Sequence, residues 1–364
     1  MKKRMISTKD LKEGMIIADT VLSPSGKVLL GKNIVVSPRT ISLLAMWNVN
    51  LVYIEANDSE PSAPEQPAAP ATAAASQAPA EAEPSQLFLQ FFNQYDALTR
   101  KATQSFDFVR DNKKVPLQGM KDTAFGIYST VLTSGPALMD YLLVSDHNLA
   151  DQLTRHSVMV AFISSVIGRQ MKLAEADIHT LVLAGLLHDI GKFVIPKEED
   201  RNPLSHVISG AKLLRNVDGL PQEVILSVLQ HHECMDGTGF PMAKEADKIH
   251  PFARIVAIAD IFHSGAYNGE HVNPFPVLER IAENQYSQLD PAVCRPFLSK
   301  IRDSLINSPV LLSNGTVAKV VFFNGDRFAS PVVKTDAGVV IDLAADSGVS
   351  IRHIATQEFL STIP

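Results

Sequence analysis

The spacing of hydrophobic positions changes twice along the chain, and this divides it into β-rich ends and a helical middle. Near the start, short apolar runs at 15–18, 28–30 and 49–54 are separated by turn residues, a pattern typical of strands. One amphipathic stretch at about 38–47 predicts a short helix between them. The first 56 residues therefore read as a small β-rich unit.

From Leu87 onward, apolar residues recur at helical spacing, beginning with an aromatic stripe. We interpret this stripe as core or inter-helix packing rather than as a ligand site. It comprises Phe88, Phe91, Phe92, Tyr95, Leu98, Ala102, Phe106 and Val109. Further helices are predicted at 117–133, 136–143, 149–171, 175–188, 204–215, 221–232, 252–265, 274–285 and 291–306.

The last part of the chain returns to the strand period. Strands are expected at 316–323, 332–335 and 339–343, with Asp336-Ala337-Gly338 as a hairpin turn. The predicted fold class is therefore mainly α, with β-rich ends. The predicted domains are a β-rich N-terminal domain (1–56), a disordered Ala/Pro-rich linker (57–86), a helical domain (87–308) and a β-rich C-terminal tail (309–364).

Composition narrows the choice of partners. The 364 residues carry a net charge of −6, which gives no reason to expect a nucleic-acid polymer or an anionic membrane as partner. No apolar run approaches the roughly 20 residues that span a bilayer. The two cysteines, Cys234 and Cys294, lie far apart and form no Cys-x-x-Cys motif, which fits a reducing compartment. We therefore expect a soluble cytoplasmic protein.

Candidate chemistry lies in two adjacent pairs, His188-Asp189 and His231-His232, each of which follows an apolar helix. Either pair alone is compatible with a polar helix end that faces water. Two such pairs, with three more residues placed at the edge of the apolar helices, favour a metal ion, because buried polar groups are costly without a partner. These additional residues are His156, His206 and Asp260.

The donor types restrict the metal. Neighbouring residues within a helix point about 100° apart, but at a helix end the chain can turn so that both side chains reach one location. Imidazole and carboxylate donors without a thiolate suit iron, manganese, cobalt or zinc with open coordination positions, rather than structural zinc. For a lone histidine such as His156, the alternative is a hydrogen-bonded core residue.

In their order along the chain, these residues resemble the motifs of an HD-GYP domain, the branch of the HD phosphohydrolases that includes cyclic di-GMP phosphodiesterases. The resemblance covers roughly residues 135–305, and residues 5–55 resemble the small domain that often precedes HD-GYP domains. It rests on His156-Ser157, His-Asp-Ile-Gly-Lys at 188–192, His206 with Gly210, His-His-Glu-x-x-Asp-Gly-x-Gly-Phe-Pro at 231–241, and Ala259-Asp260.

The resemblance implies a site for two divalent metal ions, most often iron or manganese. Asp189 would bridge them, with His156, His188 and Asp260 on one ion and His206, His231 and His232 on the other. A shared hydroxide would attack phosphorus in line with the departing 3′-oxygen. Lys192 would hold the phosphate or the nucleophile, unless it is simply a surface lysine. The signature loop beside the substrate would comprise Asp236, Gly237, Gly239, Phe240 and Pro241.

Four departures from the family pattern concern mainly the substrate side. Phe240 replaces the usual Tyr, and Gln152 stands where some members carry a Glu for a third metal, so two metals are expected. The stretch 196–206 has about half the usual length. After Asp260 the family continues Asp-Ala-x-Thr-x-x-Arg-Pro-Tyr, whereas this chain has His-Ser-Gly-Ala-Tyr-Asn-Gly-Glu at 263–270, which removes an arginine contact to phosphate.

The sequence therefore predicts a metal-dependent phosphodiesterase that converts cyclic di-GMP to linear pGpG or GMP. The altered substrate side allows for an activity lower than is usual in the family. One alternative is a weakly active or inactive receptor or scaffold that binds a cyclic dinucleotide and a signalling partner through the N-terminal domain. Another is an HD hydrolase acting on a different nucleotide. The sequence is compatible with a homodimer and does not determine the oligomeric state. The remaining histidines are interpreted as ordinary polar residues, although His263 lies close to Asp260.

Overall fold

The computed structural model describes most of the chain in two compact units, which we treat separately. Unit 1 comprises residues 1–89 and 356–364, and unit 2 comprises residues 90–355. The described residues are 3–19, 21–22, 28–30, 32, 34–37, 40–41, 44, 49, 51–55, 86–141, 152–196, 198, 202–267, 272–345 and 348–355.

Unit 1 contains two small antiparallel β-pairs. Strand β1 (Lys3–Ser7) pairs with β4 (Leu51–Glu55), and β2 (Val21–Leu22) pairs with β3 (Val28–Leu30). Alternate residues of β4 are buried, because successive side chains of a strand point to opposite faces. The strand expected at 15–18 is reduced to isolated bridges at Ile16 and Ile17. Residues 57–85 of the expected linker and most of the helix expected at 38–47 lie outside the described residues, whereas Gln86 already belongs to a helix.

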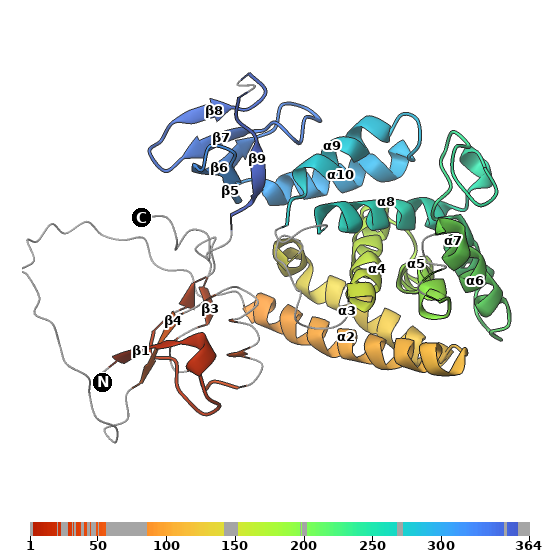
Figure 1. The fold of residues 1–364 in the computed structure, drawn as a ribbon, viewed down its shortest axis with the longest axis horizontal. Coiled ribbons are helices and arrows are strands. Elements are labelled where there is room, and N and C mark those ends of the chain that lie inside the picture. Colours follow the sequence, from red (N-terminus) through yellow and green to blue (C-terminus); the bar gives the residue numbers. More distant parts are fainter. Residues whose placement is uncertain are drawn as a thin grey trace, which may run out of the picture. The chain divides into compact units, whose positions relative to one another are not determined.

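Unit 2 is built mainly from helices (Figure 1). Helix α4 lies at its centre and contacts α3, α5 and α8. The mainly α fold class is confirmed. The helices are α2 (Gln86–Asn112), α3 (Leu117–Tyr141), α4 (Gln152–Gln170), α5 (Glu175–Leu187), α6 (Pro203–Arg215), α7 (Gln222–Gln230), α8 (Pro251–Ala266), α9 (Phe275–Asn284) and α10 (Pro291–Leu305), with short 3₁₀ turns η2 (Ile190–Phe193) and η4 (Ala246–Lys248).

Most predicted helices are found within a few residues of their expected limits, but one predicted break is wrong. Separate helices are expected at 117–133 and 136–143, whereas α3 continues from Leu117 to Tyr141 through Pro136. A proline inside a helix removes one hydrogen bond and its ring crowds the preceding turn, at a cost of about 3 kcal/mol, yet helices tolerate it, and α10 likewise contains Pro296 in its interior. The packing of α3 against α4 and α5 favours the continuous helix.

Close helix packing surrounds the centre of unit 2. Gly185 of α5 lies against α4, where an added Cβ atom would stand 3.0 Å from the Cα atom of Ala161. The aromatic stripe of α2 packs in the core, since Phe91 and Tyr95 are fully buried and their rings contact Phe162 of α4 at centroid distances of 5.7 and 5.8 Å. The described members of the stripe are buried and confirm its packing role, whereas the side chains of Phe88 and Phe92 lie outside the described residues.

A five-stranded antiparallel sheet closes unit 2, in the order β8-β7-β6-β5-β9. The turn at 336–338 joins β7 and β8 as predicted, with Gly338 at a positive φ of 83°. The sequence does not indicate β5 and β9, which are short. This sheet belongs to the same compact unit as the helices, and the domain limits stay a prediction. The strands are β5 (Pro309–Leu312), β6 (Val317–Phe322), β7 (Val332–Thr335), β8 (Val340–Asp342) and β9 (Ile351–Ile354).

Within the described part of the chain, no helix combines the length and the apolar character needed to cross a bilayer.

Candidate metal centre

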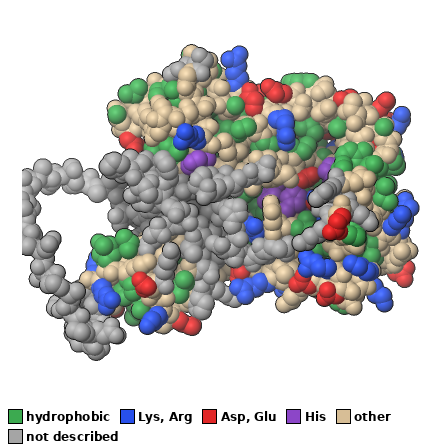
Figure 2. All heavy atoms as spheres, viewed as in Figure 1, with side chains coloured by type: hydrophobic (Ala, Val, Ile, Leu, Met, Phe, Trp, Pro, Cys, Tyr) green, Lys and Arg blue, Asp and Glu red, His purple; other side chains and the backbone are tan. Residues whose placement is uncertain are grey.

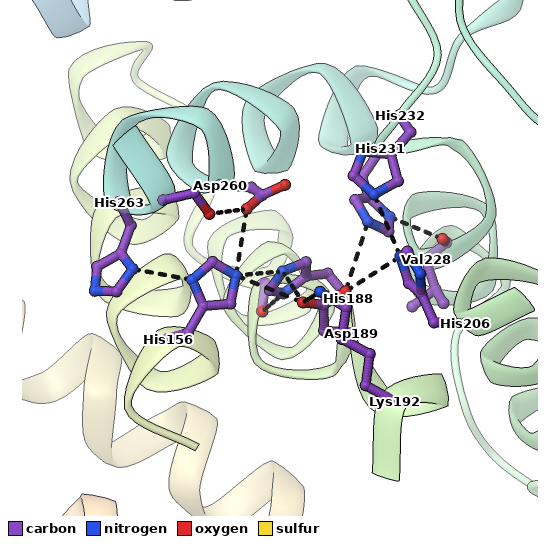
Figure 3. Close-up of polar contacts among 12 residues, drawn as sticks. His156, His188, Asp189, Lys192, His206, Val228, His231, His232, Asp260 and His263 are labelled. Carbon is purple, nitrogen blue, oxygen red and sulfur yellow. Dashed lines mark hydrogen bonds and ion pairs between the residues drawn. The ribbon is translucent and has the colours of Figure 1, made fainter. Parts of the chain in front are cut away.

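Five helices bring the predicted ligand residues to one location in unit 2 (Figure 3). His188 is the C-terminal cap of α5, and the chain turns at Asp189, where φ is −101° and ψ is 15°. His231 caps α7 in the same way, and His232 follows it. Helix ends thus let adjacent residues face one site. The other contributors are His156 from α4, His206 from α6 and Asp260 from α8.

The donors fall into two groups. In the first group, His156 Nε2 lies 3.0 Å from His188 Nε2 and 3.3 Å from Asp260 Oδ1. In the second group, His206 Nε2 lies 3.2 Å from His232 Nε2, and His231 completes the set. The ligand atoms within each group all lie within 4.8 Å of one another, a spacing suited to a single ion.

Asp189 lies between the two groups and turns one carboxylate oxygen to each. Its Oδ2 atom lies 3.4 Å from His188 Nε2 and 3.6 Å from His156 Nε2. Its Oδ1 atom lies 3.3 Å from His206 Nε2 and 4.0 Å from His231 Nε2. One carboxylate therefore serves both halves of the cluster, as Figure 3 shows.

Backbone carbonyls fix the orientation of two rings. His188 Nδ1 donates to the Gly185 carbonyl at 2.8 Å, and His231 Nδ1 donates to the Val228 carbonyl at 2.9 Å. A carbonyl oxygen only accepts, so in a neutral ring the proton is on Nδ1 and the lone pair is on Nε2. Both rings thus present Nε2 to the cluster, which is the arrangement that a metal-binding histidine requires.

Some buried polar atoms of the cluster accept or donate no hydrogen bond. Asp189 Oδ1 and His231 Nε2 find no hydrogen-bond partner among the residues that the structure describes. A buried, unsatisfied polar atom costs on the order of 1–3 kcal/mol, so its retention needs a reason. A cation between Asp189 and the histidines supplies one, and the donor set of imidazole and carboxylate fits such an ion.

Electrostatics keep most donors unprotonated near neutral pH. Burial lowers the pKa of His206 to about 4 and holds that of His231 well below its ordinary value. Burial alone would raise the pKa of Asp189, but His188 and Lys192 outweigh it and hold the pKa well below the ordinary value. His188 differs: burial alone would lower its pKa, but Asp189, Asp260 and the Gly185 carbonyl together raise it.

Lys192 lies beside the shared carboxylate. Its Nζ atom is 2.6 Å from Asp189 Oδ2, and its side chain is 29% exposed, which places a cation at the edge of the cluster.

The signature loop after α7 is held by its own residues. Glu233 is buried, and its two carboxylate oxygens accept hydrogen bonds from the backbone N–H groups of Met242 and Lys244 at 2.7 and 2.9 Å. Phe240 donates its backbone N–H to the His232 carbonyl at 3.1 Å, and its ring lies 4.7 Å from that of His232. The loop is thus fixed beside the second group.

The remaining predicted loop residues shape the turn. Gly237 has a positive φ of 77°, and at Gly239 an added Cβ atom would overlap the backbone of Glu233 and Cys234. The exposed Asp236 carboxylate accepts hydrogen bonds from Thr238, and Pro241 follows Phe240. Glycine is therefore required for the local backbone path, whereas substrate contacts for these residues stay a prediction.

Sequence reasoning misses two residues. Glu233 lies within the motif with no role assigned from the sequence, although it holds the loop. His263 is interpreted from the sequence as an ordinary polar residue, whereas its Nδ1 atom lies 2.9 Å from Nδ1 of His156 and its side chain is buried. A spacing of three residues places His263 on the same helical face as Asp260, and this is the available signal. Figure 2 shows histidine side chains reaching the face of the molecule drawn there.

The region that contains the donor cluster is similar to known proteins. Residues 153–265 match the model of the HD domain family. A cyclic di-GMP phosphodiesterase of Pseudomonas aeruginosa is 28% identical over 193 residues, 49% of this chain and 46% of that protein. A cyclic di-GMP phosphodiesterase of Thermotoga maritima is 30% identical over 141 residues, 35% and 38% of the two chains. A 3′3′-cGAMP-specific phosphodiesterase of Vibrio cholerae is 30% identical over 151 residues, 37% and 32% of the two chains.

The chain therefore spans less than half the length of these curated relatives. A solved HD-GYP-type protein of Bdellovibrio bacteriovorus superposes with a TM-score of 0.52 at 15% identity, covering 82% of this chain and 99% of that one. This likeness supports the fold.

Proposed function

We propose that this chain, which belongs to the HD-GYP group of HD-domain proteins, is a metal-dependent phosphodiesterase acting on a cyclic dinucleotide. The first substrate to consider is cyclic di-GMP, the substrate named for the relatives from Pseudomonas aeruginosa and Thermotoga maritima. The product would be the linear pGpG or GMP.

The observation that carries this proposal is the position of Asp189 between two groups of donors. His156, His188 and Asp260 would hold one cation, and His206, His231 and His232 the other, with one oxygen of Asp189 on each. Iron or manganese suits this set of imidazole and carboxylate donors. When bound, such ions activate water as a nucleophile near neutral pH and neutralise charge on the phosphate.

The protein's own residues would position the substrate. Lys192 would place its ammonium beside the phosphate that reaches Asp189, while its contact at 2.6 Å keeps that carboxylate ionised. Phe240, packed on His232, would offer an apolar face next to the reacting phosphate. The glycines of the loop would allow the backbone to approach the substrate closely.

The sequence at the end of α8 leads us to expect a lower rate of hydrolysis than in the relatives. The segment 263–267 contains no arginine, so one bidentate phosphate contact that the family pattern leads us to expect would be missing. This feature also favours the second candidate, a cyclic-dinucleotide receptor or scaffold that retains the metals for structure.

The test is hydrolysis by protein loaded anaerobically with Fe²⁺ or Mn²⁺. Cyclic di-GMP and 3′3′-cGAMP are offered in parallel, and linear products are quantified together with the metal content of the protein. Asp189→Ala should abolish hydrolysis, whereas Asp303→Asn, at an exposed position of α10, should not change it. Full metal content with binding but no turnover of either nucleotide in the parent protein would support the receptor instead.

A further inference from the structure

His263 occupies a defined position beside the first donor group. It lies on α8, one turn after Asp260, and its side chain is only 8% exposed. Its Nδ1 atom stands 2.9 Å from Nδ1 of His156, and its ring lies parallel to that of Tyr267, with centroids 4.6 Å apart and planes at 16°. In Figure 3, His263 lies on the side of His156 away from Asp189.

The contact between the two Nδ1 atoms constrains both rings. A hydrogen bond between two ring nitrogens holds one proton, so one ring donates and the other accepts. His156 Nε2 faces His188 Nε2 and Asp260 Oδ1, and a metal ion there needs the lone pair of that nitrogen. The proton of His156 must then be on Nδ1, and His263 Nδ1 must accept it.

We infer that His263 is a positioning residue for the metal ligand His156, whose ring plane and tautomer it sets by accepting the Nδ1–H hydrogen bond. This inference rests on the proposed metal centre. Two contacts suit His263 to this role, because the hydrogen bond to His156 fixes one edge of its ring and the stacking on Tyr267 fixes its plane.

His263 is a side-chain acceptor, unlike the acceptors that orient His188 and His231. His188 and His231 donate to backbone carbonyls, which no substitution removes. The family pattern places an aspartate where this chain has His263. The carboxylate of an aspartate would polarise His156 more strongly than the imidazole of His263 does. The first cation site should therefore bind metal less tightly here than it would with a carboxylate at 263.

The inference is tested on the full chain with three variants of His263. His263→Phe keeps an aromatic ring for Tyr267 but offers no acceptor, His263→Asn offers an amide oxygen, and His263→Asp offers a carboxylate. His353→Phe is the matched control, because His353 is also 8% exposed but lies on β9. The readouts are the two metal dissociation constants, from chelator competition, and the absorption spectrum of the Co²⁺-loaded protein.

Loss of an outer acceptor typically costs about 10- to 100-fold in metal affinity. We expect His263→Phe to weaken one of the two ions by such a factor and to shift the Co²⁺ spectrum. His263→Asn should restore much of the affinity, His263→Asp should match or exceed the parent, and His353→Phe should leave both ions unchanged.

The opposite results are equally distinct. The inference would be overturned if His263→Phe bound both ions as tightly as the parent protein does. It would also be overturned if the Asn and Asp variants bound metal as weakly as the Phe variant. If His263→Phe does not fold, an Asp variant at least tenfold weaker than the parent decides against it. A parent that binds no metal overturns the proposed function as well, whereas metal binding without hydrolysis contradicts the proposed function alone.

Discussion

Gly191 packs directly against the backbone of His206, so closely that an added Cβ atom would overlap the His206 carbonyl group. This approach brings α6 onto the turn that follows His188 and Asp189. It also sets the distance of 3.3 Å between His206 Nε2 and Asp189 Oδ1. The glycine of the His-Asp-Ile-Gly-Lys run thus has a steric function that its position in the motif does not reveal.

Gly191→Ala is therefore expected to destabilise the protein and to lower its metal content. Both colliding groups are backbone, so no rotamer change relieves the overlap, and overpacking of this kind costs about 1–3 kcal/mol or more. Chemical denaturation and metal analysis measure the two effects. The matched control is Gly119→Ala in α3, where the new Cβ atom meets only the Ser105 hydroxyl at 3.3 Å. Parental stability and metal content in Gly191→Ala would contradict the assigned packing.

The division of donors predicts a stepwise loss of metal. His232→Ala removes a donor from the second group only, so the metal-to-protein ratio should fall from two towards one. Asp189→Asn weakens the ligand shared by both groups and should lower the affinity for both ions. Elemental analysis after gel filtration gives these ratios. An unchanged ratio in His232→Ala would remove that residue from the ligand set.

The metal-free protein should lose stability as the pH falls from about 6.5 to about 4. Burial lowers the pKa of His206 to about 4, and those of His231 and His232 are lowered as well. Between these pH values the unfolded chain binds more protons than the folded one, so acid favours unfolding. Thermal melting of chelator-treated protein across this range measures the effect. Bound metal should diminish it, and a flat profile in the metal-free protein would contradict it.

The two cysteines should differ in reactivity. Burial raises the pKa of the Cys294 thiol to about 12, and this side chain is inaccessible within α10, whereas Cys234 is half-buried. At pH 8 a thiol-specific reagent should modify only Cys234 in the folded protein, because the thiolate is the reactive form. Modification of native Cys234→Ser at an appreciable rate would show that Cys294 is accessible after all.

Removal of residues 1–86 should leave the rest of the chain folded. The contacts of residues 90–355 group into one compact unit that contains the helices, the sheet and the donor cluster. The truncated chain should therefore melt cooperatively and retain metal at the parental ratio. Calorimetry and metal analysis test this, and a broad transition without metal would show that the N-terminal residues are needed.

Periodicity predicts the helices of unit 2 best where one face is regularly apolar, as in α2 and α10. It fails where the signal is short, since β5 and β9 each have four residues. Pro136 is misleading, because α3 continues through it despite the cost of a proline within a helix.

The donor residues can be predicted from two adjacent pairs at helix ends and from three polar side chains within apolar helices, but the contacts among them cannot. The contact of His156 with His263 joins positions 107 residues apart, and no local pattern indicates it. The two directions in which Asp189 turns its oxygens likewise depend on how α4 and α6 pack around it. Residue type and order predict which groups could meet, whereas packing determines their pairing.

The last described strand has a protective role that follows from the order of the sheet. Strand β9 pairs along β5, whose four residues are all buried, and its Ile354 also donates to the Val272 carbonyl just before α9. Without β9, β5 would present an apolar row of unpaired backbone groups, the kind of edge to which other chains add. A chain shortened before Ile351 would thus be prone to self-association through the exposed edge of β5.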